Sequence, residues 1–190
     1  MLYRPLLLRH LLSIAVLPFT VTVIVPWVLA RGNGVTLRVG SSVVDLGVQA
    51  IGLLLVGVGL VLFSASLHQF IVRGRGTLAP WDPPKHLVVN GPYRYVRNPM
   101  ISGVLFIVTG EACLLLSWPH AGWALTFFVL NAIYIPSLEE PPLRERFGAA
   151  YDEYCRHVGR VIPRLTPWTP PSTSALPRYP DTRSVRRSSL

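Results

Sequence analysis

Hydrophobic residues occur along this chain in long runs rather than in alternation with polar ones. The runs Leu11–Ala30 and Leu46–Leu67 contain no charged residue. A helix that crosses a bilayer needs about 20 consecutive apolar residues. Each of these runs therefore predicts one membrane-spanning helix.

A third apolar run lies between Arg97 and Glu139, and its only charged residue is Glu111. This run is about twice as long as one spanning helix requires. It predicts a hairpin of two helices, from Pro99 onwards and over about Gly122–Leu138, with a turn at Trp118–His120. The pattern as a whole predicts an all-α, polytopic membrane protein with four transmembrane helices.

Composition agrees with a lipid environment. Hydrophobic residues make up 51% of the chain and charged residues 14%, whereas soluble domains carry about 25% charged residues. The first run is longer than the 7–15 apolar residues of a signal peptide, and it contains Pro18 and Pro26. We therefore interpret it as a retained helix, in which the hydroxyls of Thr20 and Thr22 satisfy backbone groups that the prolines free.

The basic residues predict the topology. Of 18 Lys and Arg, only Arg31 and Arg38 fall in a loop that would face outwards if the amino terminus is cytoplasmic. Basic loops stay on the cytoplasmic side. We expect a multi-pass protein of a plasma membrane, such as the bacterial inner membrane, with both termini in the cytoplasm. The arginines accompany no nucleic-acid recognition motif, so no nucleic-acid partner is expected.

Small residues recur every seven positions in the second helix, at Gly52, Gly59 and Ser66. Small residues allow helix backbones to approach closely in lipid, so this row predicts a packing seam. Cys113 and Cys155 lie on different segments and belong to no metal-spaced cluster. We predict neither a disulfide nor a metal site.

Glu111 lies about 18 Å along the third helix from Pro99, at 1.5 Å per residue. An intramembrane acid is a candidate functional residue. Our interpretation is structural: an inward-facing carboxyl that is hydrogen-bonded to a neighbouring helix.

The segment Gly91–Gly103 reads GPYRYVRNPMISG and leads into the third helix. Tyrosines and arginines at this boundary suit a headgroup-level anchor, but they also suit a binding site. Glu139 and Glu140 follow the fourth helix on the same side. After them, Leu143, Phe147, Tyr151, Tyr154 and Val158 share one face of an expected amphipathic helix, Leu143–Val158. Gly148 within it indicates a close approach to a neighbour.

Two segments together resemble the isoprenylcysteine carboxyl methyltransferase and phospholipid methyltransferase family. They are Gly91-Pro92-Tyr93…Arg97-Asn98-Pro99-x-x-x-Gly103, and Glu139-Glu140…Phe147-Gly148-x-x-Tyr151-x-x-Tyr154. Their order and spacing around a hairpin carry the resemblance, which covers about residues 85–163. Members are integral-membrane enzymes that use S-adenosylmethionine.

The resemblance implies a cofactor site at the cytoplasmic boundary and a lipid or isoprenoid acceptor that enters from the bilayer. Methyl transfer would proceed by in-line displacement. Arg97 and Glu140 are the candidate catalytic residues. The implied cofactor-binding positions are Lys85, His86, Leu87, Val88, Tyr93, Asn98, Pro99, Met100, Ile101 and Glu139. Either Glu139 or Glu140 suits the cofactor ammonium, and either Arg97 or Lys85 suits its carboxylate.

Two alternatives remain open. One is a nicotinamide-dependent membrane reductase of the sterol type, whose members have more helices. The other is a non-catalytic scaffold, because Ile101 and Ile135 stand where the family often has Tyr and an acceptor-binding Arg. We expect three regions: 1–72 with two helices, 73–163 as the methyltransferase-like core, and 164–190 as a disordered basic tail.

Overall fold

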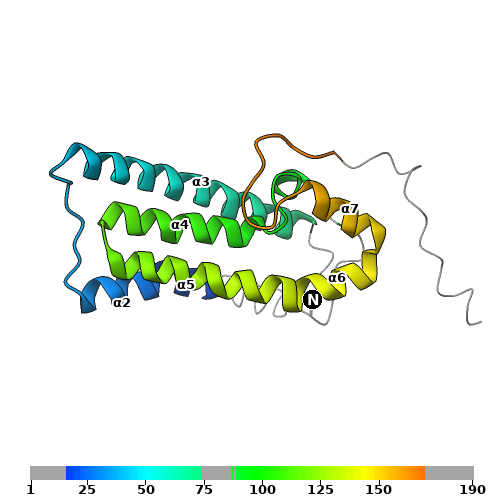
Figure 1. Ribbon diagram of the computed structural model, residues 1–190, viewed down its shortest axis with the longest axis horizontal. Coiled ribbons are helices and arrows are strands. Elements are labelled where there is room, and N and C mark those ends of the chain that lie inside the picture. Colours follow the sequence, from blue (N-terminus) through cyan, green and yellow to red (C-terminus); the bar gives the residue numbers. More distant parts are fainter. Residues whose placement is uncertain (1–15, 74–86, 88, 170–190) are drawn as a thin grey trace, which may run out of the picture.

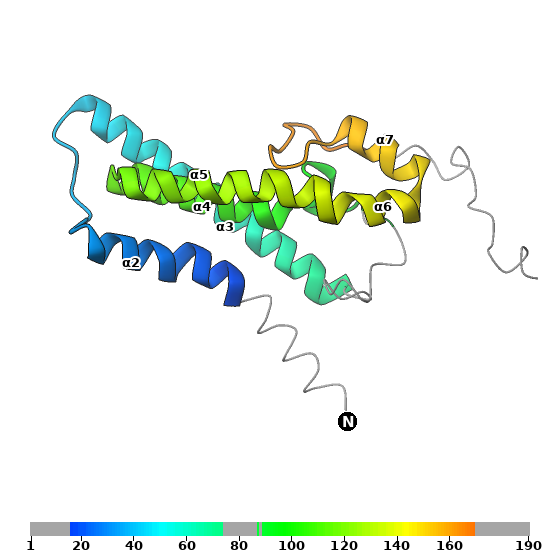
Figure 2. The ribbon, with the colours of Figure 1, turned by 60° about the horizontal axis from the view of Figure 1, so that its bottom comes forward.

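The computed structural model describes residues 16–73, 87 and 89–169, and among these residues it contains helices and loops but no strand. Three helices lie side by side: α3 (Val43–Arg73), α4 (Pro99–Leu115) and α5 (Trp118–Tyr134) (Figure 1). The amino-terminal helix runs alongside this group, in the half that contains the turn between α4 and α5, and the chain after α5 folds back near the start of α4 (Figure 2). The predicted all-helical class is confirmed for the described residues.

The amino-terminal helix is described from Val16 and passes through a π turn, Thr20–Ile24, into α2 (Val25–Gly32). Pro26 lies in the first turn of α2, where a missing N–H is tolerated. The Thr20 and Thr22 hydroxyls donate to the carbonyls four residues earlier, each at 2.8 Å. These carbonyls belong to Val16 and Pro18 and not to the residues four positions before Pro18 and Pro26, so the prediction that the threonines satisfy the groups freed by the prolines is not confirmed.

The predicted seam on the second helix is confirmed, and its partner is α4. A Cβ on Gly52 would lie 2.8 Å from the Gly110 carbonyl oxygen, and one on Gly59 would lie 2.7 Å from that of Gly103. Ser66 continues the row and is completely buried. The two backbones therefore touch along most of α4, which fixes the position of Pro99 relative to α3.

The turn between α4 and α5 is shorter than the sequence predicted. Leu116 closes α4 in a left-handed conformation, with φ 48° and ψ 45°, and Ser117 is extended. Trp118–His120 forms the first turn of α5 instead of the loop, because proline is favoured at the start of a helix. The prediction of a turn at Trp118–His120 was wrong by two residues.

Side chains of α5 hold the amino-terminal helix in place. The His120 ring bonds to the Ser117 hydroxyl (Nδ1, 2.8 Å) and to the Pro26 carbonyl (Nε2, 3.1 Å). The Trp123 indole donates to the Val21 carbonyl within the π turn, at 3.0 Å. These bonds join the amino-terminal helix to α5 at two of its backbone carbonyls.

The chain after α5 stays helical past Glu139. A π turn (Ile135–Glu139) leads into α6 (Glu140–Phe147), and α7 (Ala149–His157) follows after Gly148. The expected single helix over Leu143–Val158 was wrong, because Gly148 adopts φ 51° and ψ −131°. A Cβ on Gly148 would meet nothing within 4 Å, so the glycine is needed for its backbone conformation and not for a close approach.

The predicted apolar-aromatic face is nevertheless formed across the break. Tyr151, Tyr154 and Val158 are buried with Val89, and Leu143 and Phe147 pack against them. This cluster brings α7 back over the segment before α4.

Two segments are long and apolar enough to cross a membrane, Val43–Gln69 and Trp118–Phe147. Val16–Gly32 and Pro99–Leu115 are apolar but shorter in the described residues. Leu53, Leu54 and Val61 on α3, and Leu125 and Ile133 on α5, are more than half exposed. Such a surface suits lipid.

Candidate functional site

The segment before α4 begins with a conformation that only glycine adopts easily. Gly91 has φ 57°, and a Cβ there would collide with the Gln69 side chain of α3. Pro92 follows in a short 3₁₀ turn, Gly91–Arg94. Gly91 and Pro92 thus turn the chain against the end of α3 and present Tyr93 towards it.

The carboxy-terminal segment runs along this turn and bonds to it through the backbone. The Arg97 N–H donates to the Gly159 carbonyl at 2.8 Å, and the Arg164 N–H donates to the Tyr95 carbonyl at 2.9 Å. The Tyr154 hydroxyl donates to the Tyr93 carbonyl at 2.6 Å. Two segments about 60 residues apart in sequence therefore form one unit at the start of α4.

Three charged side chains join this unit to α6. Arg97 Nη1 lies 3.0 Å from Glu140 Oε1, and Arg160 donates to both Glu140 oxygens, at 2.6 and 3.1 Å. The Glu140 side chain is 7% exposed and that of Arg97 12%. Bonding to Glu140 raises the pKa of the Arg160 guanidinium. Because both oxygens of Glu140 are used, this carboxylate is already neutralised by the protein itself.

Glu139 has no such partner. It is half-buried at the end of the π turn, and within the described part of the chain it makes no hydrogen bond or ion pair. Burial raises the pKa of the Tyr93 phenol, and the Glu139 carboxylate adds to this rise. The Ser66 hydroxyl is near enough to the phenol to oppose the rise, although it forms no hydrogen bond of normal geometry. The ionisation of Tyr93 in the 3₁₀ turn is thus affected by side chains from two other elements, Ser66 of α3 and Glu139 of the π turn.

Two further polar atoms at this site are buried and lack a hydrogen bond within the described residues. They are Ser66 Oγ and Arg97 Nε. A buried polar group without a partner costs about 1–3 kcal/mol. A polar ligand that supplied the missing hydrogen bonds would remove this cost.

The remaining predicted residues divide into three groups. Lys85, His86 and Val88 lie outside the described residues. Asn98 and Pro99 begin α4, where the Asn98 carbonyl accepts from the Ser102 hydroxyl at 2.9 Å. Leu87 packs against the Tyr151–Tyr154 cluster, and Met100 is half-buried in the first turn of α4. Ile101 packs against a second buried cluster between α4 and α5, which consists of Val104, Val108, Ala124 and Phe127.

The structure adds residues that the sequence did not indicate. Arg160 is the second partner of Glu140, and Cys155 Sγ lies 2.8 Å from Arg97 Nη1. Trp168 packs against the Tyr154 ring, with centroids 5.7 Å apart, and Arg94 donates to its carbonyl at 2.8 Å. No spacing rule links these positions to the motif, since the pairing depends on the reversal at Gly148.

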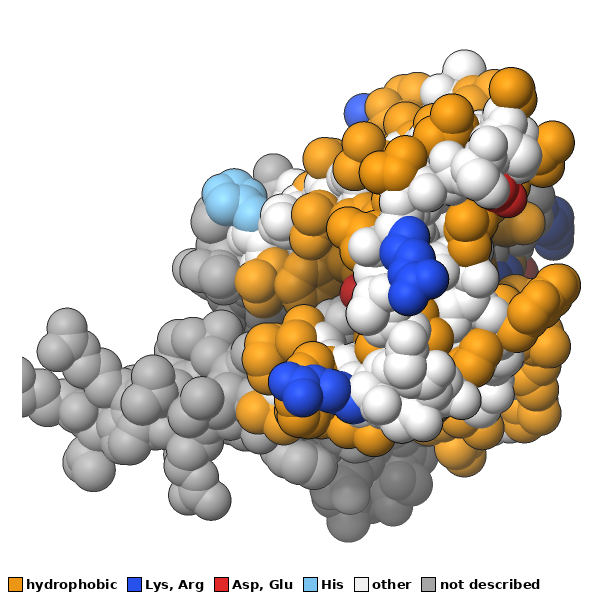
Figure 3. Space-filling model, turned by 90° about the vertical axis from the view of Figure 1, so that its left-hand side faces the viewer, with side chains coloured by type: hydrophobic (Ala, Val, Ile, Leu, Met, Phe, Trp, Pro, Cys, Tyr) orange, Lys and Arg blue, Asp and Glu red, His pale blue; other side chains and the backbone are white. Residues whose placement is uncertain are grey.

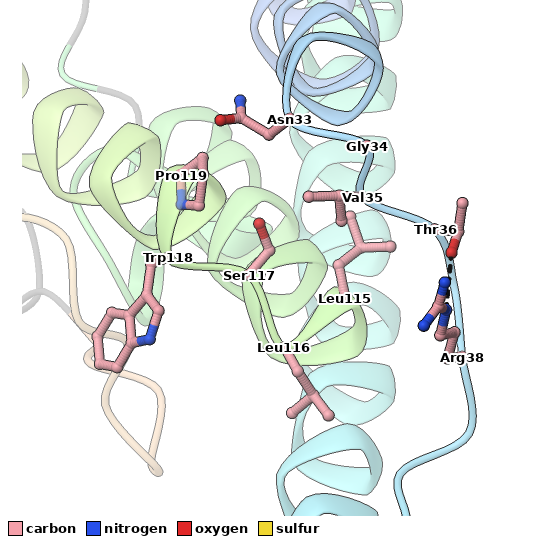
Figure 4. A pocket seen from close by; sticks show the side chains of 10 residues that line it. All are labelled: Asn33, Gly34, Val35, Thr36, Arg38, Leu115, Leu116, Ser117, Trp118 and Pro119. Carbon is pink, nitrogen blue, oxygen red and sulfur yellow. Dashed lines mark hydrogen bonds between the residues drawn. The ribbon is translucent and has the colours of Figure 1, made fainter.

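Two hollows in the surface lie away from this site, at the other end of the helices. One, of about 470 Å³, is bordered by Val35 and Arg38 of the loop after α2, by Leu115 at the end of α4 and by Ser117 between α4 and α5 (Figure 4). Arg38 donates to the Thr36 hydroxyl there at 3.2 Å. The other, of about 410 Å³, is lined in part by Glu111.

Comparison with known proteins identifies a family whose members share most of this region of the chain. A family model described as phospholipid methyltransferase matches residues 48–150, which run from α3 into α7 and contain the first motif segment and the second as far as Gly148. No curated protein and no solved structure matches the chain. The match covers more than half of the chain, and the apolar helices agree with a membrane methyltransferase. The chain belongs to the phospholipid methyltransferase family.

Proposed function

We propose that this protein transfers a methyl group from S-adenosylmethionine to a lipid or isoprenoid acceptor in the membrane. The family supports a membrane methyltransferase. The donor, the acceptor and the site residues are our proposal. It rests on the arrangement of Glu139, Tyr93 and Ser66 beside the Arg97–Glu140–Arg160 cluster.

The observation that carries the proposal is the difference between two adjacent acids. Glu140 is bound by two guanidinium groups, whereas Glu139 is half-buried and unpaired among the described residues. The cofactor carries an ammonium group and ribose hydroxyls, and both are donors to a carboxylate. We therefore assign this recognition to Glu139, with Tyr93 forming the adjacent wall.

Arg97 and Glu140 were put forward from the sequence as catalytic residues. Since each binds the other, we propose that they act by holding the motif turn against α6. Arg97 Nε, which is buried without a partner in the described residues, can donate one further bond to a cofactor oxygen. Lys85, His86, Leu87 and Val88 complete the proposed cofactor wall together with Asn98, Pro99, Met100 and Ile101.

For methyl transfer, the main task of the protein is to align the methyl donor with the acceptor. A lone pair of the acceptor attacks the methyl carbon, the carbon–sulfur bond breaks, and its electron pair remains on sulfur as a neutral thioether. Alignment of two bound reactants can contribute about 7–11 kcal/mol to lowering a barrier. An amine acceptor must also release a proton to a base, whereas a carboxylate acceptor need not.

The proposed topology has four spanning helices and both termini in the cytoplasm. It places the Arg97 site at the cytoplasmic boundary, because the basic residues gather on that side. Residues 1–72 would contribute the first two helices and residues 73–163 the methyl-transfer core. The acceptor would reach the site from the bilayer between the apolar helix surfaces.

Calorimetric titration of the purified full chain in detergent tests the proposal. We expect S-adenosylmethionine and its demethylated product to bind, and NADPH not to bind. Heat from NADPH alone would favour a reductase, and no heat from any of the three ligands would favour a scaffold. Either result would overturn the proposal.

Matched variants test the assignment of Glu139. Glu139→Gln should weaken binding of S-adenosylmethionine by about tenfold, since a charge-assisted bond contributes about 1.5–3 kcal/mol. Glu145→Gln is the control, because Glu145 is exposed on α6. Equal affinity of the Glu139 variant and the parent would refute the site assignment while leaving the cofactor open.

A further inference from the structure

Three side-chain atoms in the described part of the chain are buried and have no hydrogen-bond partner there: Ser66 Oγ, Arg97 Nε and Glu111 Oε2. Glu111 lies near the far end of α4, where the surface is largely hydrophobic with basic side chains between (Figure 3). The hydrogen bond to a neighbouring helix that we expected for Glu111 is thus not formed among the described residues. Ser66 and Arg97 lie at the candidate site, and Ser66 is the more deeply buried of the two, with 0% exposure.

Ser66 continues the seam of α3 past the start of α4. The preceding residue of the row, Gly59, lies against Gly103 of α4. Ser66 is seven residues further along α3, and near its end this helix contacts the 3₁₀ turn Gly91–Arg94. Glycine serves at the earlier positions of the row, so close packing does not require a hydroxyl. A buried hydroxyl without a partner costs stability, and the presence of this one calls for another reason.

The group that the Ser66 hydroxyl affects is the phenol of Tyr93. Burial raises the pKa of this phenol, and the Ser66 hydroxyl opposes the rise. A hydrogen-bond donor to the phenol oxygen has this effect, because it favours the phenolate. The two hydroxyls do not form a bond of normal geometry in the ligand-free chain. Its formation therefore requires a rotation of one of the two side chains.

The direction of such a bond decides what Tyr93 can bind. A hydroxyl donates one hydrogen bond and can accept others. A phenol oxygen that accepts from Ser66 keeps its own proton for another acceptor, and hydrogen bonds in such a chain strengthen one another. The Glu139 carboxylate is also close to the phenol, since its charge adds to the rise of the phenol pKa. The site thus offers an O–H donor next to an unpaired carboxylate.

The amino-acid part of S-adenosylmethionine requires such a pair of partners. Its ammonium and its carboxylate are attached to the same carbon atom, so an acceptor and a donor must lie side by side. We propose that Ser66 is a positioning residue, whose hydroxyl donates to the Tyr93 phenol so that the phenol donates to the cofactor carboxylate beside Glu139. This inference rests on the proposed function and adds to the site a residue of α3, which lies outside both motif segments.

Calorimetric titration of the full chain in detergent with S-adenosylmethionine tests the role of the hydroxyl. Ser66→Ala should weaken binding about fivefold, as expected for the loss of one hydrogen bond between neutral groups. Ser64→Ala is the control, because Ser64 is exposed on the same helix, and its affinity should stay within about twofold of that of the parent. Unchanged affinity of Ser66→Ala would refute this inference and leave the proposed function standing. Absence of binding to the parent protein would overturn both.

A second ligand identifies the part of the cofactor on which Ser66 acts. Decarboxylated S-adenosylmethionine keeps the ammonium and the adenosine but lacks the carboxylate. The parent should bind it more weakly than S-adenosylmethionine, and Ser66→Ala should bind it as tightly as the parent does, within about twofold. An equal loss of affinity for both ligands would refute the assignment to the carboxylate.

Removal of the phenol hydroxyl tests whether Ser66 acts through Tyr93. Tyr93→Phe should weaken binding of S-adenosylmethionine and not of its decarboxylated form. The double variant should bind S-adenosylmethionine no more weakly than Tyr93→Phe alone, because the two changes remove one shared interaction. Additive losses would show that Ser66 acts independently of Tyr93, contrary to the proposal.

Thermal unfolding without ligand separates a positioning role from a packing role. Ser66→Ala removes a buried hydroxyl that has no partner in the described part of the chain, so the variant should be at least as stable as the parent. Weaker binding of the cofactor without a loss of stability is expected of a positioning residue. Lower stability with an equal loss of affinity for both ligands would show that Ser66 contributes only to the packing of α3.

Discussion

The guanidinium group of Arg97 lies 3.0 Å from the carboxylate of Glu140, 43 positions further along the chain. Arg97 belongs to the turn before α4, and Glu140 begins α6. Their ion pair therefore connects the two motif segments, and both residues lie within the range that the family model matches, residues 48–150. Arg160 completes the cluster from the segment after α7.

The first prediction concerns the stability that this cluster provides. Glu140→Gln would leave the buried guanidinium of Arg97 and the partly exposed one of Arg160 without their anion. Loss of one partner of a fully buried pair costs about 3–5 kcal/mol, and the exposure of Arg160 places the expected cost at the lower end of this range. The exposed pair Arg144–Asp152 supplies the control, with side chains 55% and 43% exposed. Asp152→Asn should cost less than about 1 kcal/mol.

Thermal unfolding in detergent measures both variants. The buried variant should unfold at a clearly lower temperature than the exposed one. Equal shifts would contradict the view that Glu140 is the shared anion of Arg97 and Arg160.

The second prediction concerns the seam between α3 and α4. Gly59→Ala places a methyl group 2.7 Å from the Gly103 carbonyl oxygen and 2.8 Å from Ile107. Because neither helix can move away alone, we expect a loss of about 1–3 kcal/mol from overpacking. Gly57→Ala is the matched control on the same helix, since its methyl group meets nothing within 4 Å.

The control should be neutral or more stable, because alanine is favoured over glycine in a helix by about 1 kcal/mol. Unfolding of the two variants under one condition checks the difference. If Gly59→Ala were as stable as Gly57→Ala, the close approach of the two helices would be wrong.

The sequence predicted the features that depend on local pattern. The apolar helices and the seam at Gly52, Gly59 and Ser66 follow from hydrophobicity and spacing. The family was predicted from the resemblance of the two motif segments, and the family model confirms it. Proline position was harder to interpret. The sequence predicted a turn that contains Pro119, but Pro119 lies in the first turn of α5, where proline is accepted.

The part of the site that the sequence did not predict depends on tertiary contacts. The sequence does not show which of Glu139 and Glu140 lacks an ion-pair partner. The answer depends on Arg160, which binds Glu140 and lies outside both motif segments. Arg160 reaches Glu140 only after the chain reverses at Gly148. In the sequence, the reversal is marked only by one glycine, which can indicate either a close approach of two helices or a backbone with positive φ.

The third prediction concerns this reversal. Gly148→Ala should cost about 1–3 kcal/mol, because a side chain is strained at φ 51° and ψ −131° although there is space for it. Gly122→Ala in α5 is the control, since it also has open space but no positive φ. Circular dichroism with thermal unfolding measures both, and equal stability of the two variants would contradict the strained conformation.

The last prediction concerns the ionisation of tyrosines in the motif unit. Burial raises the pKa of the phenols of Tyr93, Tyr151 and Tyr154 above the ordinary value of about 10. The folded chain therefore keeps protons that the unfolded chain releases near pH 10. The stability that these phenols contribute is fully present below pH 10 and is lost as the pH rises above it.

Alkaline titration followed by ultraviolet absorbance checks this expectation. Of the seven tyrosines in the chain, three should ionise only as the protein unfolds. Tyr154→Phe should reduce the number of late-ionising groups by one. It should also lower stability by about 0.5–1.5 kcal/mol at neutral pH, because it removes the bond to the Tyr93 carbonyl. Reversible ionisation of all seven groups in the folded protein would show that the motif unit is open to solvent.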